Sequence, residues 1–249
     1  MNKFMLFIHK TGSPPWFYNF SGKLLPWMWA IFLITASVGL YLGLVKAPPD
    51  YLQGESARIM YIHVPSAYMS MMIYALMAVM GFIGLVWHVR IAEILSISSA
   101  PIGAIFTLLA LATGSLWGRP TWGTYWVWDA RLTSELVLFF LYLGVMGLYS
   151  AYDEPRKAAR AAALLALVGL VNLPIIHYSV TWWNTLHQPP SLTTEGSSIH
   201  PSMLVPLLIM VVAFKFFYIS NLLARARTRL LEQDQRKRWV HERLAEGES

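Results

Sequence analysis

Hydrophobic residues in this chain are gathered into long uninterrupted runs. Six such stretches, each close to the roughly 20 residues that a helix needs to cross the hydrocarbon of a bilayer, are separated by short polar segments. Only helices or closed barrels satisfy their backbone in lipid, and continuous apolar runs of this length exclude a barrel. The pattern predicts an all-α polytopic membrane protein, a single six-span domain over 1–249, with transmembrane helices at about 24–45, 64–87, 98–117, 132–152, 161–180 and 203–223.

Composition supports this class and limits the possible chemistry. Hydrophobic residues make up 56% of the 249 residues and charged residues only 13%. The chain has no Cys, which excludes disulfides and thiolate metal sites, so any metal ligand must come from His, Met, Tyr or a carboxylate. The net charge of +6 could suggest nucleic acid, but basic residues in a membrane protein more often reflect topology, and we expect no nucleic-acid partner.

The distribution of Lys and Arg predicts the orientation. With the N-terminus inside, 14 of these residues fall on inner segments and 4 on outer segments, while Lys215 lies in the last span. This asymmetry predicts that both termini are cytoplasmic. Residues 1–23 then form a cytoplasmic arm and residues 224–249 a charged cytoplasmic tail. The outer segments are 46–63, 118–131 and 181–202.

The outer segment 118–131 and the residue before it are rich in tryptophan. Four of the 11 Trp lie within 13 residues, and Gly118, Pro120 and Gly123 are expected to prevent a simple helix there. The alternative is an aromatic belt, because Trp is enriched at membrane interfaces. A cluster this dense instead favours a flat ligand platform formed by Trp117, Trp122, Trp126 and Trp128.

Charged residues flank the platform. Arg119 and Arg131 can each pair with a carboxylate through two parallel hydrogen bonds, while Asp129 is expected to orient an Arg or the backbone. Such a platform suits a flat apolar ligand with carboxylates at its edge, and haem is one such ligand. The alternative for Arg131 is a local pair with Glu135, one helical turn later.

Two outer histidines next to aromatic residues, His63 and His187, are candidate axial ligands to iron, since neutral imidazole is a common haem ligand. The alternative for each is an ordinary hydrogen-bonding role at the interface. His200 is a competing outer candidate without aromatic neighbours. His177 lies near the outer end of the fifth span, where Pro174 is expected to kink the helix.

Three motifs together resemble the cytochrome c maturation protein C family of haem-handling proteins with a tryptophan-rich "WWD" segment. They are the segment 117–136, the stretch His-Val-Pro-Ser-Ala at 63–67, and residues 172–188. The resemblance implies a multi-pass protein of the bacterial inner membrane. It implies that haem b (iron protoporphyrin IX) is held on the periplasmic side by the WWD segment, with His63 and His187 as axial ligands.

The resemblance also implies partners. These are a membrane-anchored periplasmic haem chaperone that receives the haem, a small single-span maturation subunit, the permease and ATPase subunits of an ABC-type transporter, and membrane lipid. The chain has no Gly-x-x-x-x-Gly-Lys-Ser/Thr loop, so we expect a haem carrier rather than an enzyme, with any ATP hydrolysis in a partner. The alternatives are a di-haem redox protein, a haem-permease subunit, or a structural subunit in which the tryptophans only pack.

Overall fold

The computed structural model describes residues 12–189, 191–193 and 196–247. Most of these residues are helical, and six helical segments are long and apolar enough to cross a membrane, which confirms the predicted class and number of spans. A two-stranded sheet pairs Leu192 with Ser197. The elements are α2 (Pro14–Tyr41), the π-helical η1 (Leu42–Lys46), the 3₁₀ turn η2 (Glu55–Ile59), α3 (Met60–Trp87), α4 (Arg90–Trp122), α5 (Ala130–Ser150), α6 (Pro155–Gly169), α7 (Asn172–Trp182), β1 (Leu192–Thr193), β2 (Gly196–Ser197), α8 (Pro201–Asp234) and α9 (Arg238–Gly247).

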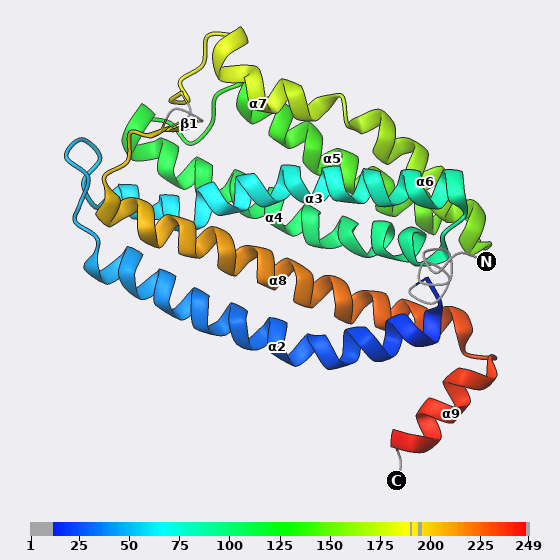
Figure 1. Cartoon of the computed structure of the whole chain (residues 1–249). Coiled ribbons are helices and arrows are strands. Elements are labelled where there is room, and N and C mark those ends of the chain that lie inside the picture. The colour runs from blue at the N-terminus through cyan, green and yellow to red at the C-terminus, as the bar shows by residue number, and fades with distance from the viewer. Residues whose placement is uncertain (1–11, 190, 194–195, 248–249) are drawn as a thin grey trace.

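The helices pack as a bundle in which α3 and α4 are central (Figure 1). Helix α8 lies against both of them, and α2 covers α8 on its outer side. Helices α5, α6 and α7 cover the opposite side. The buried core is formed by α3, α4, α5, α6, α7 and α8, and its largest fully buried members are Tyr74 and Tyr142.

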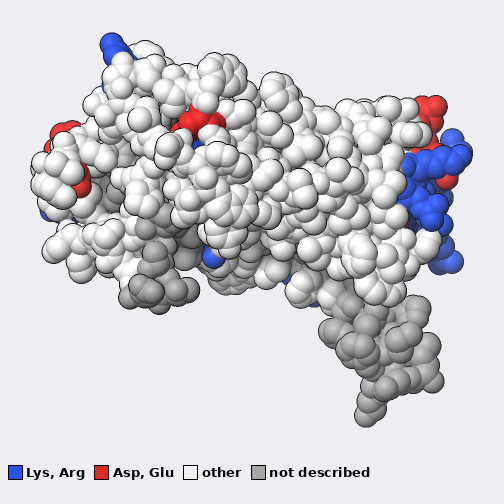
Figure 2. Space-filling view, turned by 90° about the horizontal axis from the view of Figure 1, so that it is seen from above, with Lys and Arg blue, Asp and Glu red and all other residues white. Residues whose placement is uncertain are grey.

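The two ends of the bundle differ. The start of α2, the α3–α4 turn, the α5–α6 turn and α9 lie at one end, and the loops 47–54 and 123–129 and the described residues of the segment between α7 and α8 lie at the other (Figure 1). Lys and Arg side chains gather at the first of these ends, while the middle of the bundle shows few charges on the visible face (Figure 2). The uncharged middle is what a segment inside hydrocarbon requires.

Helix α4 continues further than the sequence suggested. The expectation that Gly118 and Pro120 prevent a helix is wrong, because α4 includes both and ends at Trp122. Gly and Pro are tolerated in long membrane helices whose neighbours stabilise them. The break comes only at Gly123, which has φ +81° and donates its N–H to the Arg119 carbonyl at 3.1 Å, a left-handed C-terminal cap.

The fifth span is interrupted, as the proline in its sequence predicted. Helix α6 ends at Gly169, α7 begins at Asn172, and Leu173 N–H donates to the Leu170 carbonyl at 3.1 Å in a tighter turn. Pro174 explains the position, because a proline ring clashes with the carbonyl four residues earlier, here that of Leu170.

The packing of Tyr142 on α4 gives a stability prediction. Its ring is fully buried, its hydroxyl donates to the Ser70 carbonyl at 2.7 Å, and a Cβ at Gly103 would lie 2.1 Å from the ring. Gly103→Ala should therefore lower the free energy of unfolding by about 1–3 kcal/mol. Thermal unfolding in detergent measures the change. The control is Gly147→Ala, where a Cβ meets nothing within 4 Å and the unfolding temperature should not fall. Equal unfolding temperatures for the two variants would contradict the packing.

Candidate functional site

His63 lies in the first turn of α3 and is held by α4. Its Nδ1 is 3.0 Å from the Ala110 carbonyl oxygen and 3.1 Å from Thr113 Oγ1. A carbonyl oxygen only accepts, so Nδ1 carries the proton in this arrangement. In the neutral ring the lone pair is then on Nε2, which is the state that a metal-binding histidine needs.

His187 lies in the loop after α7. Its backbone N–H donates to Thr185 Oγ1 at 3.0 Å, and its Nδ1 is 3.2 Å from the Gln188 carbonyl oxygen. Burial first, and the nearby charge of Arg131 second, lower the pKa of His187 from its usual value of 6.5. His187 is therefore a neutral imidazole near pH 7, again with Nδ1 protonated and Nε2 available.

The two imidazoles lie next to each other. Their ring centroids are 6.5 Å apart and their planes differ by 32°. A metal atom bonded to two imidazoles at about 2 Å would hold their centroids about 6 Å apart, close to this separation. The described residues hold no group of three or more His, Asp or Glu that could bind a bare metal ion. The pair thus suits a metal that brings its own remaining ligands.

Of the four tryptophans, Trp117 and Trp122 lie against the two histidines, and Trp126 and Trp128 lie against each other. Trp117 meets the His63 ring edge-on at 5.7 Å, and Trp122 lies 6.1 Å from the His187 ring. Trp126 and Trp128 lie in the loop after α4 and pack edge-to-face on each other at 5.4 Å. Trp128 is 77% exposed, whereas the indole N–H of Trp126 is buried and has no hydrogen-bond partner among the described residues. That buried donor is available to an acceptor on a ligand.

The flanking arginines differ in their contacts. Arg119 is exposed and donates to the Gly123 carbonyl within its own loop. Arg131 is partly buried and donates to the Ile176 carbonyl of α7 at 3.4 Å. The local pair of Arg131 with Glu135 is not formed, and Glu135 accepts from the Ser70 hydroxyl at 2.7 Å instead. Neither arginine forms a salt bridge with a carboxylate in the described chain.

Asp129 connects α5 to the loop of His187. One carboxylate oxygen caps α5 by accepting from Leu132 N–H at 2.8 Å, and the other accepts from the Thr185 hydroxyl. Because Thr185 in turn accepts from His187 N–H, Asp129 holds the backbone of His187 at the start of α5. An acidic N-cap there is also favoured by the helix dipole.

Several residues of this site were not found from the sequence. Gly114 leaves room for the His63 ring, since a Cβ there would lie 2.8 Å from its Cε1, and Gly118 leaves room for Trp122. The sequence does contain a pattern that indicates these two glycines. Gly114 and Gly118 are one helical turn apart, and small residues at that spacing mark close contacts on membrane helices. Gln53 accepts from the Trp117 indole at 2.7 Å and Thr185 links Asp129 to His187, and no local pattern reveals either.

The other outer histidines have different surroundings. His200 is exposed at the start of α8, where its Nδ1 accepts from Ser202 N–H at 3.3 Å as an N-cap. His177 packs edge-on against Tyr178 at 4.7 Å, on α7. Neither ring is paired with another imidazole in the described chain.

Comparison with known proteins assigns the family. The family described as Heme exporter protein C matches residues 7–241. Heme exporter protein C of Escherichia coli (strain K12) is 51% identical over 235 residues, covering 94% of this chain and 95% of the relative. The protein of the same name from Bradyrhizobium diazoefficiens is 50% identical, covering 89% and 84%, and a putative cytochrome c biosynthesis ccmC-like mitochondrial protein of Arabidopsis thaliana is 44% identical, covering 80% and 75%. The chain belongs to the heme exporter protein C family. The resemblance found in the sequence is thereby confirmed.

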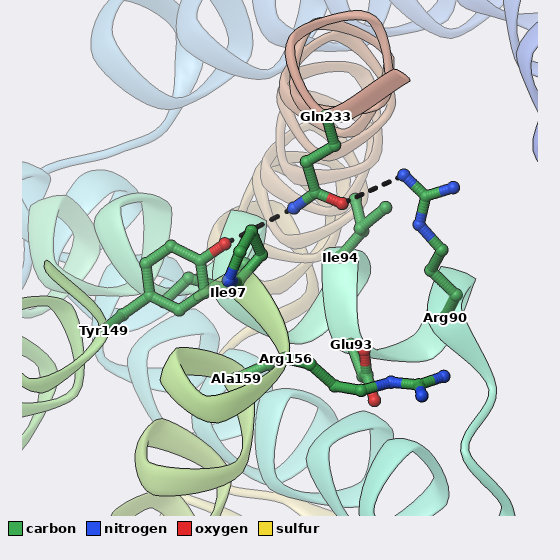
Figure 3. A pocket seen from close by; sticks show the side chains of 9 residues that line it. Arg90, Glu93, Ile94, Ile97, Tyr149, Arg156, Ala159 and Gln233 are labelled. Atoms are coloured by element: carbon green, nitrogen blue, oxygen red, sulfur yellow. Dashed lines mark hydrogen bonds between the residues drawn. The ribbon is translucent and has the colours of Figure 1, made fainter. Parts of the chain in front are cut away.

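In this member of the heme exporter protein C family, the opposite end of the bundle contains a small hollow of about 90 Å³ (Figure 3). Arg90 donates there to Asp234 at 2.6 and 3.0 Å and to Gln233 at 3.2 Å, and Gln233 donates to the Tyr149 hydroxyl at 3.4 Å. Glu93 also lines the hollow. These bonds tie the start of α4 to the end of α8, so we assign this end a structural role.

The link from Asp129 to His187 gives a prediction. Asp129→Ala removes the α5 cap, at a cost of about 1 kcal/mol, and releases Thr185, so chymotrypsin should cleave within 182–188 faster than in the wild type. Limited proteolysis in detergent measures the rate. Asp50→Ala is the control, because Asp50 accepts from Leu52 and Gln53 N–H in a different loop. Faster cleavage at 182–188 in the control, or none in Asp129→Ala, would refute the link.

Proposed function

We propose that this protein binds haem at the end of the bundle that holds His63 and His187 and passes it to a haem acceptor during the biogenesis of c-type cytochromes. The observation that carries the proposal is the pair of imidazoles 6.5 Å apart, each with Nδ1 against a carbonyl oxygen. Relatives named heme exporter protein C over nearly the whole chain support the same ligand.

The coordination we propose uses His63 and His187 as the two axial ligands of haem b. The porphyrin supplies the four equatorial nitrogens, so two imidazoles complete the coordination. Backbone carbonyls that accept from the other ring nitrogen fix the tautomer and raise the basicity of the ligand. Both rings have this arrangement without any carboxylate in contact with them.

The surrounding residues suit the porphyrin and its edge. Trp117 and Trp122 supply aromatic faces next to the imidazoles, and each aromatic contact contributes about 0.5–1.5 kcal/mol beyond the buried area. The unpartnered indole N–H of Trp126 and the guanidiniums of Arg119 and Arg131 are donors for propionates. Trp128 is exposed and extends the aromatic surface outwards, and Asp129 acts by holding the loop.

We infer a carrier rather than a catalyst. One ligand lies on a helix end and the other on a loop, so the haem would lie at the rim of the bundle, where a second protein can reach it. Axial imidazoles are exchangeable, so they hold haem without covalent commitment. The proposed acceptor is a membrane-anchored periplasmic haem chaperone, and the proposed partners are a small single-span subunit and the permease and ATPase subunits of an ABC-type transporter.

The orientation we propose places the histidine end on the periplasmic side of the bacterial inner membrane. The charge distribution along the sequence supports it, because 14 Lys and Arg fall on the segments predicted to be inner and 4 on those predicted to be outer. Figure 2 shows basic side chains gathered at one end of the bundle, the end with the α3–α4 and α5–α6 turns.

Reporter fusions test the orientation. Fusions after residues 123 and 188 should report a periplasmic location, and fusions after 153 and 236 a cytoplasmic one, because both termini are proposed to be inside. Paired alkaline phosphatase and green fluorescent protein reporters make each location a positive signal. A cytoplasmic signal at 123 would place the histidine pair on the wrong side for a periplasmic acceptor and would end this part of the proposal.

Replacing the ligands tests haem binding. Protein purified from haem-replete cells should show a six-coordinate, low-spin spectrum. His63→Gly and His187→Gly should each lose it, because iron loses one axial nitrogen, and added imidazole should partly restore it. Visible spectroscopy and a haem assay measure both effects. The same variants should load the chaperone more slowly in proportion to the haem they lose.

His200→Gly is the matched control, since His200 is an exposed outer histidine that caps α8. Its spectrum should equal that of the wild type. Loss of the low-spin spectrum in His200→Gly with an unchanged spectrum in His187→Gly would show that the second ligand is misassigned. Wild-type protein without haem, from haem-replete cells, would refute the function.

A further inference from the structure

We propose that Thr113 and Gly114 are positioning residues for His63, and that together with the Ala110 carbonyl they form a seat on α4 that fixes the direction of its free nitrogen. This inference rests on the proposed function, in which His63 binds the iron of haem. None of the three contacts comes from α3, the helix that carries His63, so the seat is a feature of the helix pair.

The hydrogen bonds of Thr113 leave its side-chain oxygen able to act only as an acceptor for His63. Its hydroxyl donates to the Leu109 carbonyl at 2.6 Å, so the hydrogen is engaged within α4. The oxygen can then only accept from His63 Nδ1, which lies 3.1 Å away. Together with the Ala110 carbonyl at 3.0 Å, Thr113 gives the Nδ1 proton two acceptors on one helix face.

Gly114 provides the space that these bonds need. A Cβ built at Gly114 would lie 2.8 Å from Cε1 and 3.4 Å from Nδ1 of His63, so any larger residue must displace the ring. On the adjacent turn of α4, Trp117 meets the ring edge-on at 5.7 Å and restricts where it can go. A displaced ring loses the two acceptors of Nδ1, and with them the fixed direction of Nε2.

The second histidine shows the contrast. The Nδ1 contact of His187 is to the carbonyl of its neighbour Gln188, within the same loop. That ring contact lies within its own loop, whereas the ring contacts of His63 belong to another helix. Helix α4 therefore fixes the direction of the His63 ring, and no second helix contacts the His187 ring nitrogen in the described chain.

The test uses haem-loaded full-length protein and reads the iron directly. Gly114→Ala should convert the low-spin spectrum partly to high spin, and added imidazole should reverse the change as it does for His63→Gly. Thr113→Val keeps the shape but removes the acceptor, and should weaken haem retention about 10-fold, the lower end of the usual effect of an outer-shell partner. Thr113→Ser returns the acceptor and should rescue the retention lost in Thr113→Val.

Gly147→Ala is the matched glycine control, because a Cβ there meets nothing within 4 Å, and it should keep the wild-type spectrum. If Gly114→Ala fails to fold, Thr113→Val and Thr113→Ser decide the outcome. Wild-type spectra and retention in both Gly114→Ala and Thr113→Val, while His63→Gly still loses the low-spin spectrum, would overturn the seat and leave the proposed function intact. An unchanged spectrum in His63→Gly would overturn both.

Discussion

The register of α3 against α4 is the constraint on which the rest of the structure depends. Two side chain-to-backbone hydrogen bonds set it, from Ser96 to the Met77 carbonyl at one end and from His63 to the Ala110 carbonyl at the other. Met77 and His63 are fourteen residues apart on α3, as are Ser96 and Ala110 on α4. The two bonds therefore describe one antiparallel alignment, held at points about 21 Å apart along the helices.

The site is built outward from this pair. Helices complete their own backbone hydrogen bonds inside the membrane, so irregular chain, apart from the break between α6 and α7, lies at the ends, where side chains must satisfy it. At the histidine end, Gln53 ties the loop before α3 to Trp117, and Asp129 ties the loop of His187 to α5. Two loops distant in sequence are thereby attached to the ends of helices.

Local patterns in the sequence predicted much of this and missed what depends on contacts between helices. The apolar runs predicted the six spans, and Pro174 predicted the break before α7. Both predictions succeed because each pattern acts within one helix. The continuation of α4 through Gly118 and Pro120 depends on neighbouring elements, and so do the contacts of Trp117 and Trp122 with the histidines. The seat of His63 depends on how α3 aligns with α4. The pattern of one segment alone does not reveal that alignment.

The residues of α4 that face His63 recur with the spacing of one helix stripe, at Ala110, Thr113, Gly114 and Trp117. The hydrogen bond of Ser96 fixes α4 against α3, so the stretch of α4 from Ser96 to Ala110 determines the direction of this stripe. The length of that stretch therefore matters more to the site than its composition. Apolar exchanges on the lipid-facing side of that stretch leave the stripe in place. A single inserted residue turns the stripe by about 100° and directs it away from α3, whatever residue is inserted.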